Sequence, residues 1–128
     1  MSKKFLIYIF LFLILASLAA FFVISKNSST QPALPQGKTY EVILGENGFS
    51  PNETTIKVGD SIRFKSSLNQ AFWPASDLHP THGIYPEFDP QEPIEASNSW
   101  TFQFLKTGLW KYHDHLSPYN RGVITVTP

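Results

Sequence analysis

The sequence contains no cysteine. This absence excludes disulfide bonds, iron–sulfur ligation, zinc–thiolate sites and thiol catalysis. An excess of basic charge is also lacking, because ten Lys and Arg residues balance ten Asp and Glu residues. From residue 38 onward, seven basic residues stand against ten acidic ones, which leaves this part of the chain with a net charge of −3. A nucleic-acid partner is therefore not expected, since phosphate binding requires a basic face.

A long apolar run occurs only near the N-terminus, where residues 5–24 carry no charge. Twenty residues at a helical rise of about 1.5 Å span about 30 Å, the thickness of a bilayer core. Lys3 and Lys4 precede the run and favour a cytoplasmic N-terminus. We therefore predict a membrane anchor over residues 1–25. A signal peptide cleaved near the small residues Ser17 and Ala19 is the alternative.

Residues 26–37 are polar and contain two prolines, which is typical of a linker. The remaining residues, 38–128, have the length of one domain. Anchor and signal peptide alike would export this domain. The sequence thus predicts a single-pass protein of the cell membrane with its domain on the extracytoplasmic side, periplasmic or extracellular.

The exported domain lacks any long helical period and instead shows short alternating runs separated by turn residues. This pattern predicts an all-β sandwich. Strands are expected at Thr39–Leu44, Thr55–Val58, Ser61–Lys65, around Trp100 to Phe104, at Leu109–Asp114 and at Val123–Thr127. The Gly59-Asp60 pair between the second and third of these predicts a hairpin turn. The long segment between Ser66 and Ser99 is expected to have a functional role, and Trp73, Trp100 and Trp110 are expected in the core.

All four histidines fall in two short clusters. His79 and His82 lie in Leu-His-Pro-Thr-His-Gly, and His113 and His115 lie in Tyr-His-Asp-His-Leu. On a strand, His-x-His places both imidazoles on one face. Neutral imidazole is the commonest protein ligand of copper and zinc. We therefore predict a metal site made by at least three of the four, while an unliganded structural role stays open.

Carboxylates flank both clusters. Asp77 is interpreted as a turn cap, and Glu87 and Asp89 as solvated loop residues. Asp114 stands apart because it lies between two of the histidines.

Two parts of the domain resemble the cupredoxins. Phe49-Ser50-Pro51 and the Ile56-x-Val58-x-Asp60-x-Ile62-x-Phe64 run resemble the opening strands of that family. Gly108-x-Trp110-x-Tyr112 and Arg121-Gly122-Val123-Ile124-x-Val126 resemble its closing hairpin. The resemblance implies a Greek-key β-sandwich, preceded here by the N-terminal transmembrane helix.

The copper-ligand loop of amicyanin-like cupredoxins aligns with this chain from Tyr112 to Gly122 without a gap. Asp114 occupies the position of the copper-binding cysteine, Ser117 that of the histidine and Asn120 that of the methionine. A blue-copper centre depends on a Cu–thiolate bond. The family's electron-transfer site is therefore not expected here.

A second resemblance involves the histidines themselves. His79-Pro80-x-His82 and His113-Asp114-His115 look like parts of multicopper-oxidase motifs. That resemblance implies that His113 and His115 face away from Asp114.

The sequence thus predicts a membrane-anchored, extracytoplasmic cupredoxin-like protein. We expect it to bind a copper ion, in preference to zinc, at a non-blue site formed by His79, His82, His113 and His115. A metal-free interaction module and a copper-dependent redox enzyme remain as alternatives, and the sequence favours a non-enzymatic role. The protein partner is not predicted.

Overall fold

A computed structural model describes residues 37–128 of the chain. The predicted anchor and all but the last residue of the predicted linker lie outside these residues. Within residues 37–128, no helix is long and apolar enough to cross a membrane.

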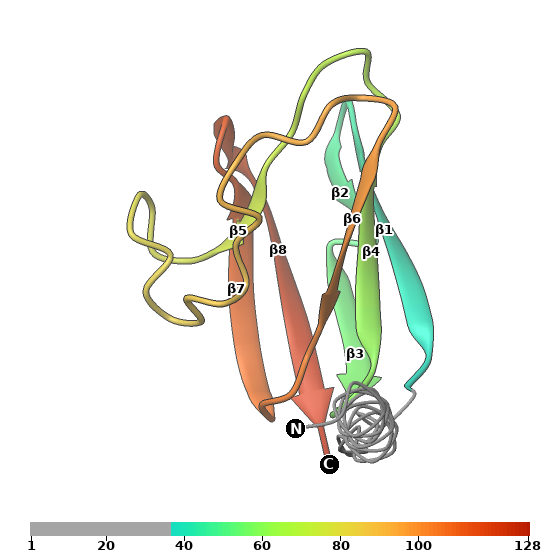
Figure 1. Cartoon of the computed structure of the whole chain (residues 1–128), viewed down its shortest axis with the longest axis vertical. Coiled ribbons are helices and arrows are strands. Elements are labelled where there is room, and N and C mark those ends of the chain that lie inside the picture. The colour runs from blue at the N-terminus through green and yellow to red at the C-terminus, as the bar shows by residue number, and fades with distance from the viewer. Residues whose placement is uncertain (1–36) are drawn as a thin grey trace, which may run out of the picture. The chain divides into compact units, whose positions relative to one another are not determined.

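The described domain consists of two four-stranded sheets (Figure 1). One sheet has the order β2-β1-β4-β6, formed by Gly48–Ser50, Thr39–Gly45, Ser61–Ser66 and Ser99–Gln103. The other has the order β3-β8-β7-β5, formed by Glu53–Lys57, Ser117–Thr127, Gly108–Asp114 and Pro74–Ser76. The prediction of an all-β sandwich is confirmed.

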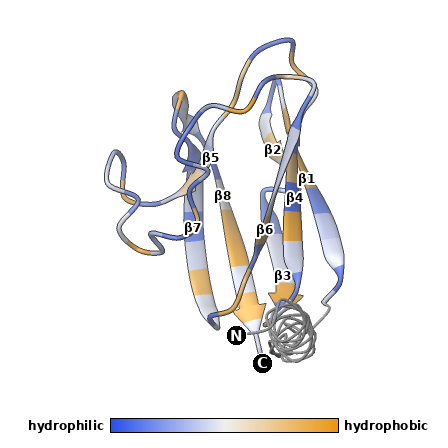
Figure 2. Cartoon of the chain, in the orientation of Figure 1, coloured by the Kyte–Doolittle hydropathy of each residue, from blue (hydrophilic) through white to orange (hydrophobic). Residues whose placement is uncertain are grey.

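The strands form where apolar and polar residues alternate. In β4, Ile62 and Phe64 are fully buried while Arg63 between them is exposed. Hydrophobic bands accordingly alternate with hydrophilic ones along β4 (Figure 2). This period of two is what a sheet with one buried face requires.

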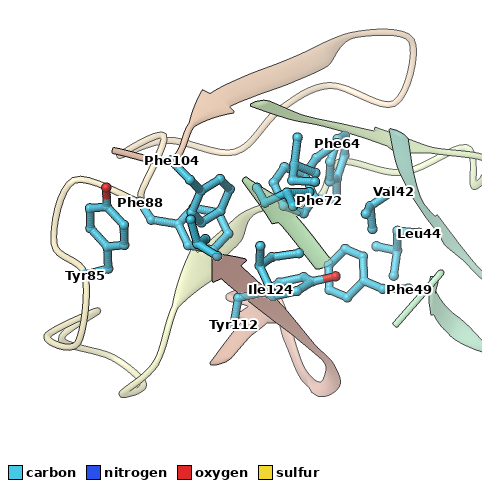
Figure 3. Close-up of a cluster of buried hydrophobic side chains, with 13 residues drawn as sticks. Val42, Leu44, Phe49, Phe64, Phe72, Tyr85, Phe88, Phe104, Tyr112 and Ile124 are labelled. Atoms are coloured by element: carbon cyan, nitrogen blue, oxygen red, sulfur yellow. The ribbon is translucent and has the colours of Figure 1, made fainter. Parts of the chain in front are cut away.

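Aromatic rings fill the space between the two sheets (Figure 3). Phe64 of β4 and Phe88 of the long loop stack with ring centroids 5.5 Å apart. The ring of Tyr112 in β7 lies against that of Phe49, with centroids 4.9 Å apart. Large rings bury much apolar area per residue, which suits a small domain without disulfides. Trp100 and Trp110 pack against this core as expected.

The prediction of a hairpin at Gly59-Asp60 is wrong. The turn is present, but β3 pairs with β8 and β4 pairs with β1 and β6, so the chain passes from one sheet to the other. Asp60 holds the crossing in place, because its buried carboxylate accepts the backbone N–H groups of Lys38 at 2.7 Å and Lys57 at 2.9 Å. A Gly-Asp pair indicates a turn and does not specify whether its strands pair.

Candidate metal centre

The end of β7 presents two of the histidines on the outer face of its sheet. Tyr112 lies in the core, so strand alternation turns His113 to the opposite face. The loop that follows β5 covers that face and leaves His113 with no exposed surface. His115 follows directly after the strand and is half-buried. Asp114, which lies between His113 and His115 in the sequence, is also buried.

The loop after β5 brings the other two histidines to the same place. Nδ1 of His79 lies 3.2 Å from Nε2 of His113, and Nε2 of His82 lies 2.9 Å from Nδ1 of His115. Ligand nitrogens of His79, His113 and His115 all lie within 4.8 Å of one another. The structure thus brings together all four predicted residues. His79, His113 and His115 form a group of three, and His82 lies beside it in contact with His115.

A carboxylate fixes the orientation of the buried imidazole. Oδ1 of Asp77 lies 2.8 Å from Nδ1 of His113. The same carboxylate accepts hydrogen bonds from Arg121 at 3.0 and 3.3 Å. The interpretation of Asp77 as a turn cap is therefore wrong. Carboxylates in this position set the ring orientation and increase the basicity of metal-binding histidines.

A second carboxylate holds His82. Oδ2 of Asp89 lies 2.6 Å from Nδ1 of His82, and Oδ1 accepts hydrogen bonds from the Trp73 indole at 2.8 Å and from the backbone N–H of Gln91 at 2.7 Å. The interpretation of Asp89 as a solvated residue is wrong. Glu87, by contrast, is exposed as expected and pairs with Lys106 at 2.9 Å. His82 has a φ of 51°, a conformation that a non-glycine residue adopts at some energetic cost.

These contacts favour one set of tautomers. His113 and His82 each place Nδ1 against a carboxylate, so each donates Nδ1–H and turns an unprotonated Nε2 toward the cluster. His79 and His115 then donate their Nδ1–H to those Nε2 atoms. Neutral imidazole is the form that binds a metal.

The pKa values of His113 and His115 favour the neutral form of these two rings. Burial lowers the pKa of His113, although the Asp77 carboxylate acts in the opposite direction. Burial, together with the neighbouring His82 and His79, lowers the pKa of His115. Burial tends to raise the pKa of Asp89, but hydrogen bonds from Gln91, Trp73 and His82 outweigh it and lower that pKa.

We expect the metal-free domain to lose stability as the pH falls below about 6.5, the ordinary histidine pKa. The folded pKa values of His113 and His115 are lowered, so the unfolded chain binds protons first. Stability is complete above the unfolded pKa and is lost as the pH falls through the folded values. Thermal unfolding between pH 8 and pH 5 measures this loss. The double variant His113→Phe/His115→Phe should flatten the profile, and an unchanged slope in that variant would assign the loss to other groups.

Asp114 does not turn toward the histidines. Its Oδ1 accepts hydrogen bonds from the backbone N–H groups of Trp73 at 2.8 Å and Leu116 at 3.3 Å. The carboxylate that occupies the cysteine position thus ties the end of β7 to the segment before β5. His113 and His115 face away from it, as the multicopper-oxidase resemblance implied.

Trp73 belongs to this site and not to the core, contrary to the prediction. Its ring lies against His115 with centroids 4.5 Å apart, and its carbonyl accepts the backbone N–H of His115 at 2.7 Å. The indole N–H meanwhile holds Asp89. A tryptophan in a sequence pattern indicates burial, but it does not indicate which group its N–H contacts.

The variant Trp73→Phe is expected to weaken copper binding by about 10–100-fold, the usual effect of losing an outer-shell partner. Phenylalanine keeps a ring beside His115 and removes the N–H that orients Asp89. Competition titration against a copper chelator measures the affinity. Trp110→Phe is the matched control, because its indole donates to the Lys106 carbonyl, a backbone group remote from the histidines. Equal affinities in the two variants would contradict the orienting role of Trp73.

Comparison with known proteins supports the fold. No protein-family profile matches the sequence, and no curated protein does. Among solved structures, a purple cupredoxin from Nitrosopumilus maritimus matches with a TM-score of 0.59 and 20% identity, over 68% of this chain and 98% of that one. A mutant of amicyanin in its reduced Cu(I) form matches with a TM-score of 0.60 and 18% identity, over 70% of this chain and 82% of that one. A mutant plastocyanin of a fern matches with a TM-score of 0.56 and 16% identity, over 69% and 100%.

The described domain has the cupredoxin fold.

Within this cupredoxin fold, the candidate metal ligands occupy different positions from the ligands of a type 1 copper centre. The chain has no cysteine for a type 1 centre, and Asp114 in its place is used by backbone hydrogen bonds. The histidine cluster lies on the other side of β7, between the sheet and the loop that covers it. The imidazole group could hold copper, and it differs from the type 1 site in both ligands and location.

Proposed function

We propose that this protein is a membrane-anchored, extracytoplasmic cupredoxin-like domain that binds one copper ion through His79, His113 and His115. The observation that carries the proposal is the convergence of three ligand nitrogens within 4.8 Å. Two nitrogens that bind one ion at about 2 Å are at most about 4 Å apart. Small shifts of the exposed His79 would therefore complete the site.

The donor set favours copper over zinc. Neutral imidazole nitrogens bind divalent copper more tightly than zinc in the usual affinity order. Without a thiolate, bound Cu(II) would give a weakly coloured centre of type 2 character. His82 would supply a fourth nitrogen or orient His115, whose Nδ1 lies 2.9 Å away. The protein's role would be copper handling on the outer side of the membrane.

Metal competition tests this proposal. The full chain, purified in mild detergent without metal, would be exposed to equimolar Cu(II) and Zn(II), desalted, and analysed by mass spectrometry and EPR spectroscopy. We expect one retained copper with a type 2 spectrum. Retention of zinc alone would refute the preference for copper. A chain that retains neither ion would refute the metal site and leave the fold as a metal-free interaction module.

A further inference from the structure

The end of the sandwich opposite the histidine cluster combines exposed apolar and basic side chains. Strands β1, β4 and β7 begin at this end, and β3, β6 and β8 end there (Figure 1). The first described residue, Gly37, enters here, and the following Lys38 accepts the backbone N–H of Ser61 at 2.8 Å. We call this surface the tether end and define it by six exposed residues, Lys38, Lys57, Val58, Leu105, Lys106 and Leu109.

The apolar members of the tether end are close in the fold. The N–H of Val58 bonds to the carbonyl of Thr127 at 2.8 Å, and the next residue, Gly59, bonds to Phe104 at 2.8 Å. Leu105 follows Phe104, and Leu109 lies just beyond the turn. These three side chains are 41%, 48% and 58% exposed. Exposed apolar side chains that lie close together are a feature of protein and membrane contact sites.

Lysines lie among the apolar members of the tether end, in a domain that is acidic as a whole. Residues 38–128 carry a net charge of −3, yet the tether end presents three lysines. Asp60 is buried, and its carboxylate accepts the backbone N–H groups of Lys38 and Lys57, so it does not face solvent beside their side chains. Glu87 pairs with Lys106 alone. Lysines around exposed apolar side chains are the composition that binds an anionic lipid surface.

We propose that the tether end rests on the membrane, with Val58, Leu105 and Leu109 in the headgroup region and the lysines against anionic lipid. This inference rests on the proposed anchor. If residues 5–24 are the anchor, residues 26–36 would connect it to Gly37 at the tether end over at most about 40 Å, the reach of an extended chain. The histidines would then face away from the membrane, about 20 Å further out along the seven-residue strand β7.

The absence of cysteine allows a direct test with single spin labels. The full chain with Thr107→Cys, labelled at that position, would be reconstituted in vesicles of phosphatidylglycerol and phosphatidylcholine. Thr107 is exposed within the tether end and keeps all six defining residues intact. Tyr119→Cys is the matched control, because Tyr119 is 97% exposed on the β7–β8 hairpin at the opposite end. We expect lower mobility and higher oxygen accessibility at position 107 in the anionic vesicles, and no change at position 119.

Adding Lys38→Glu and Lys57→Glu to the Thr107→Cys chain should reduce the docked fraction relative to the free one by about fivefold for each lysine. A label at 107 that stays mobile in a chain that floats with the vesicles would refute the docking and leave the anchor intact. A chain that does not float would refute the anchor and the docking together. Immobilisation that disappears on dilution with unlabelled chain would identify a contact between copies, and it too would overturn the proposal.

Discussion

The variant His113→Ala is expected to lose copper affinity by more than the roughly 100-fold that removal of an outer-shell partner can cause. His113 is the fully buried member of the group, and Asp77 fixes its ring so that Nε2 points to the other histidines. Copper affinity of the full chain, measured by chelator competition, gives the result directly.

The variant His82→Asn provides the comparison. Asparagine tolerates the positive φ of this position, so the loop keeps its path. Because His82 stands beside the group of three, its loss should cost about 10–100-fold, as for an outer-shell residue. Equal losses for the two variants would show a four-histidine site. Unchanged affinity in His113→Ala would refute the site altogether.

The variant Asp114→Cys is expected to restore the missing thiol without restoring blue copper. Ser117 and Asn120 occupy the other positions of the ligand loop, so a thiolate would lack its partners. The change also removes the acceptor of the Trp73 and Leu116 N–H groups. An unsatisfied buried donor costs about 1–3 kcal/mol, and each kcal/mol lowers the Tm of a domain of this size by about 4–8 °C.

Absorption spectra of the copper-loaded variant and thermal unfolding of the metal-free one measure the two effects. Asp114→Asn keeps a carbonyl oxygen in place and should lose less stability than Asp114→Cys. An intense visible absorption band from a Cu–thiolate bond, as in blue-copper sites, would contradict the spectroscopic prediction. Equal stability of both variants and the parent chain would contradict the structural role of Asp114.

Much of the fold could be predicted because the alternation of apolar and polar residues along a strand indicates which side chains are buried. Strand β4, with Ile62 and Phe64 inward, needed no tertiary information. The pairing of β3 could not be predicted in this way, because its partner β8 is distant in sequence. The same holds for Asp60, whose carboxylate accepts the N–H of the distant Lys38.

The histidine cluster could be predicted because its members occur in pairs and nowhere else in the sequence. Its carboxylate partners could not. Asp77 and Asp89 lie in a segment rich in proline and acidic residues, where local chemistry indicates turns and solvent. Their contacts with His113 and His82 arise only when the loop folds back over β7.

The histidine cluster lies on the outside of the sheet, so folding of the core does not depend on metal binding. The aromatic core closes between the sheets, and none of its members is a proposed ligand. Only the loop after β5 must adjust when an ion arrives, because His113 is already fixed on its strand. Such a domain would fold before it acquires metal, so the supply of copper would limit how much of the protein is metal-loaded without limiting how much of it folds.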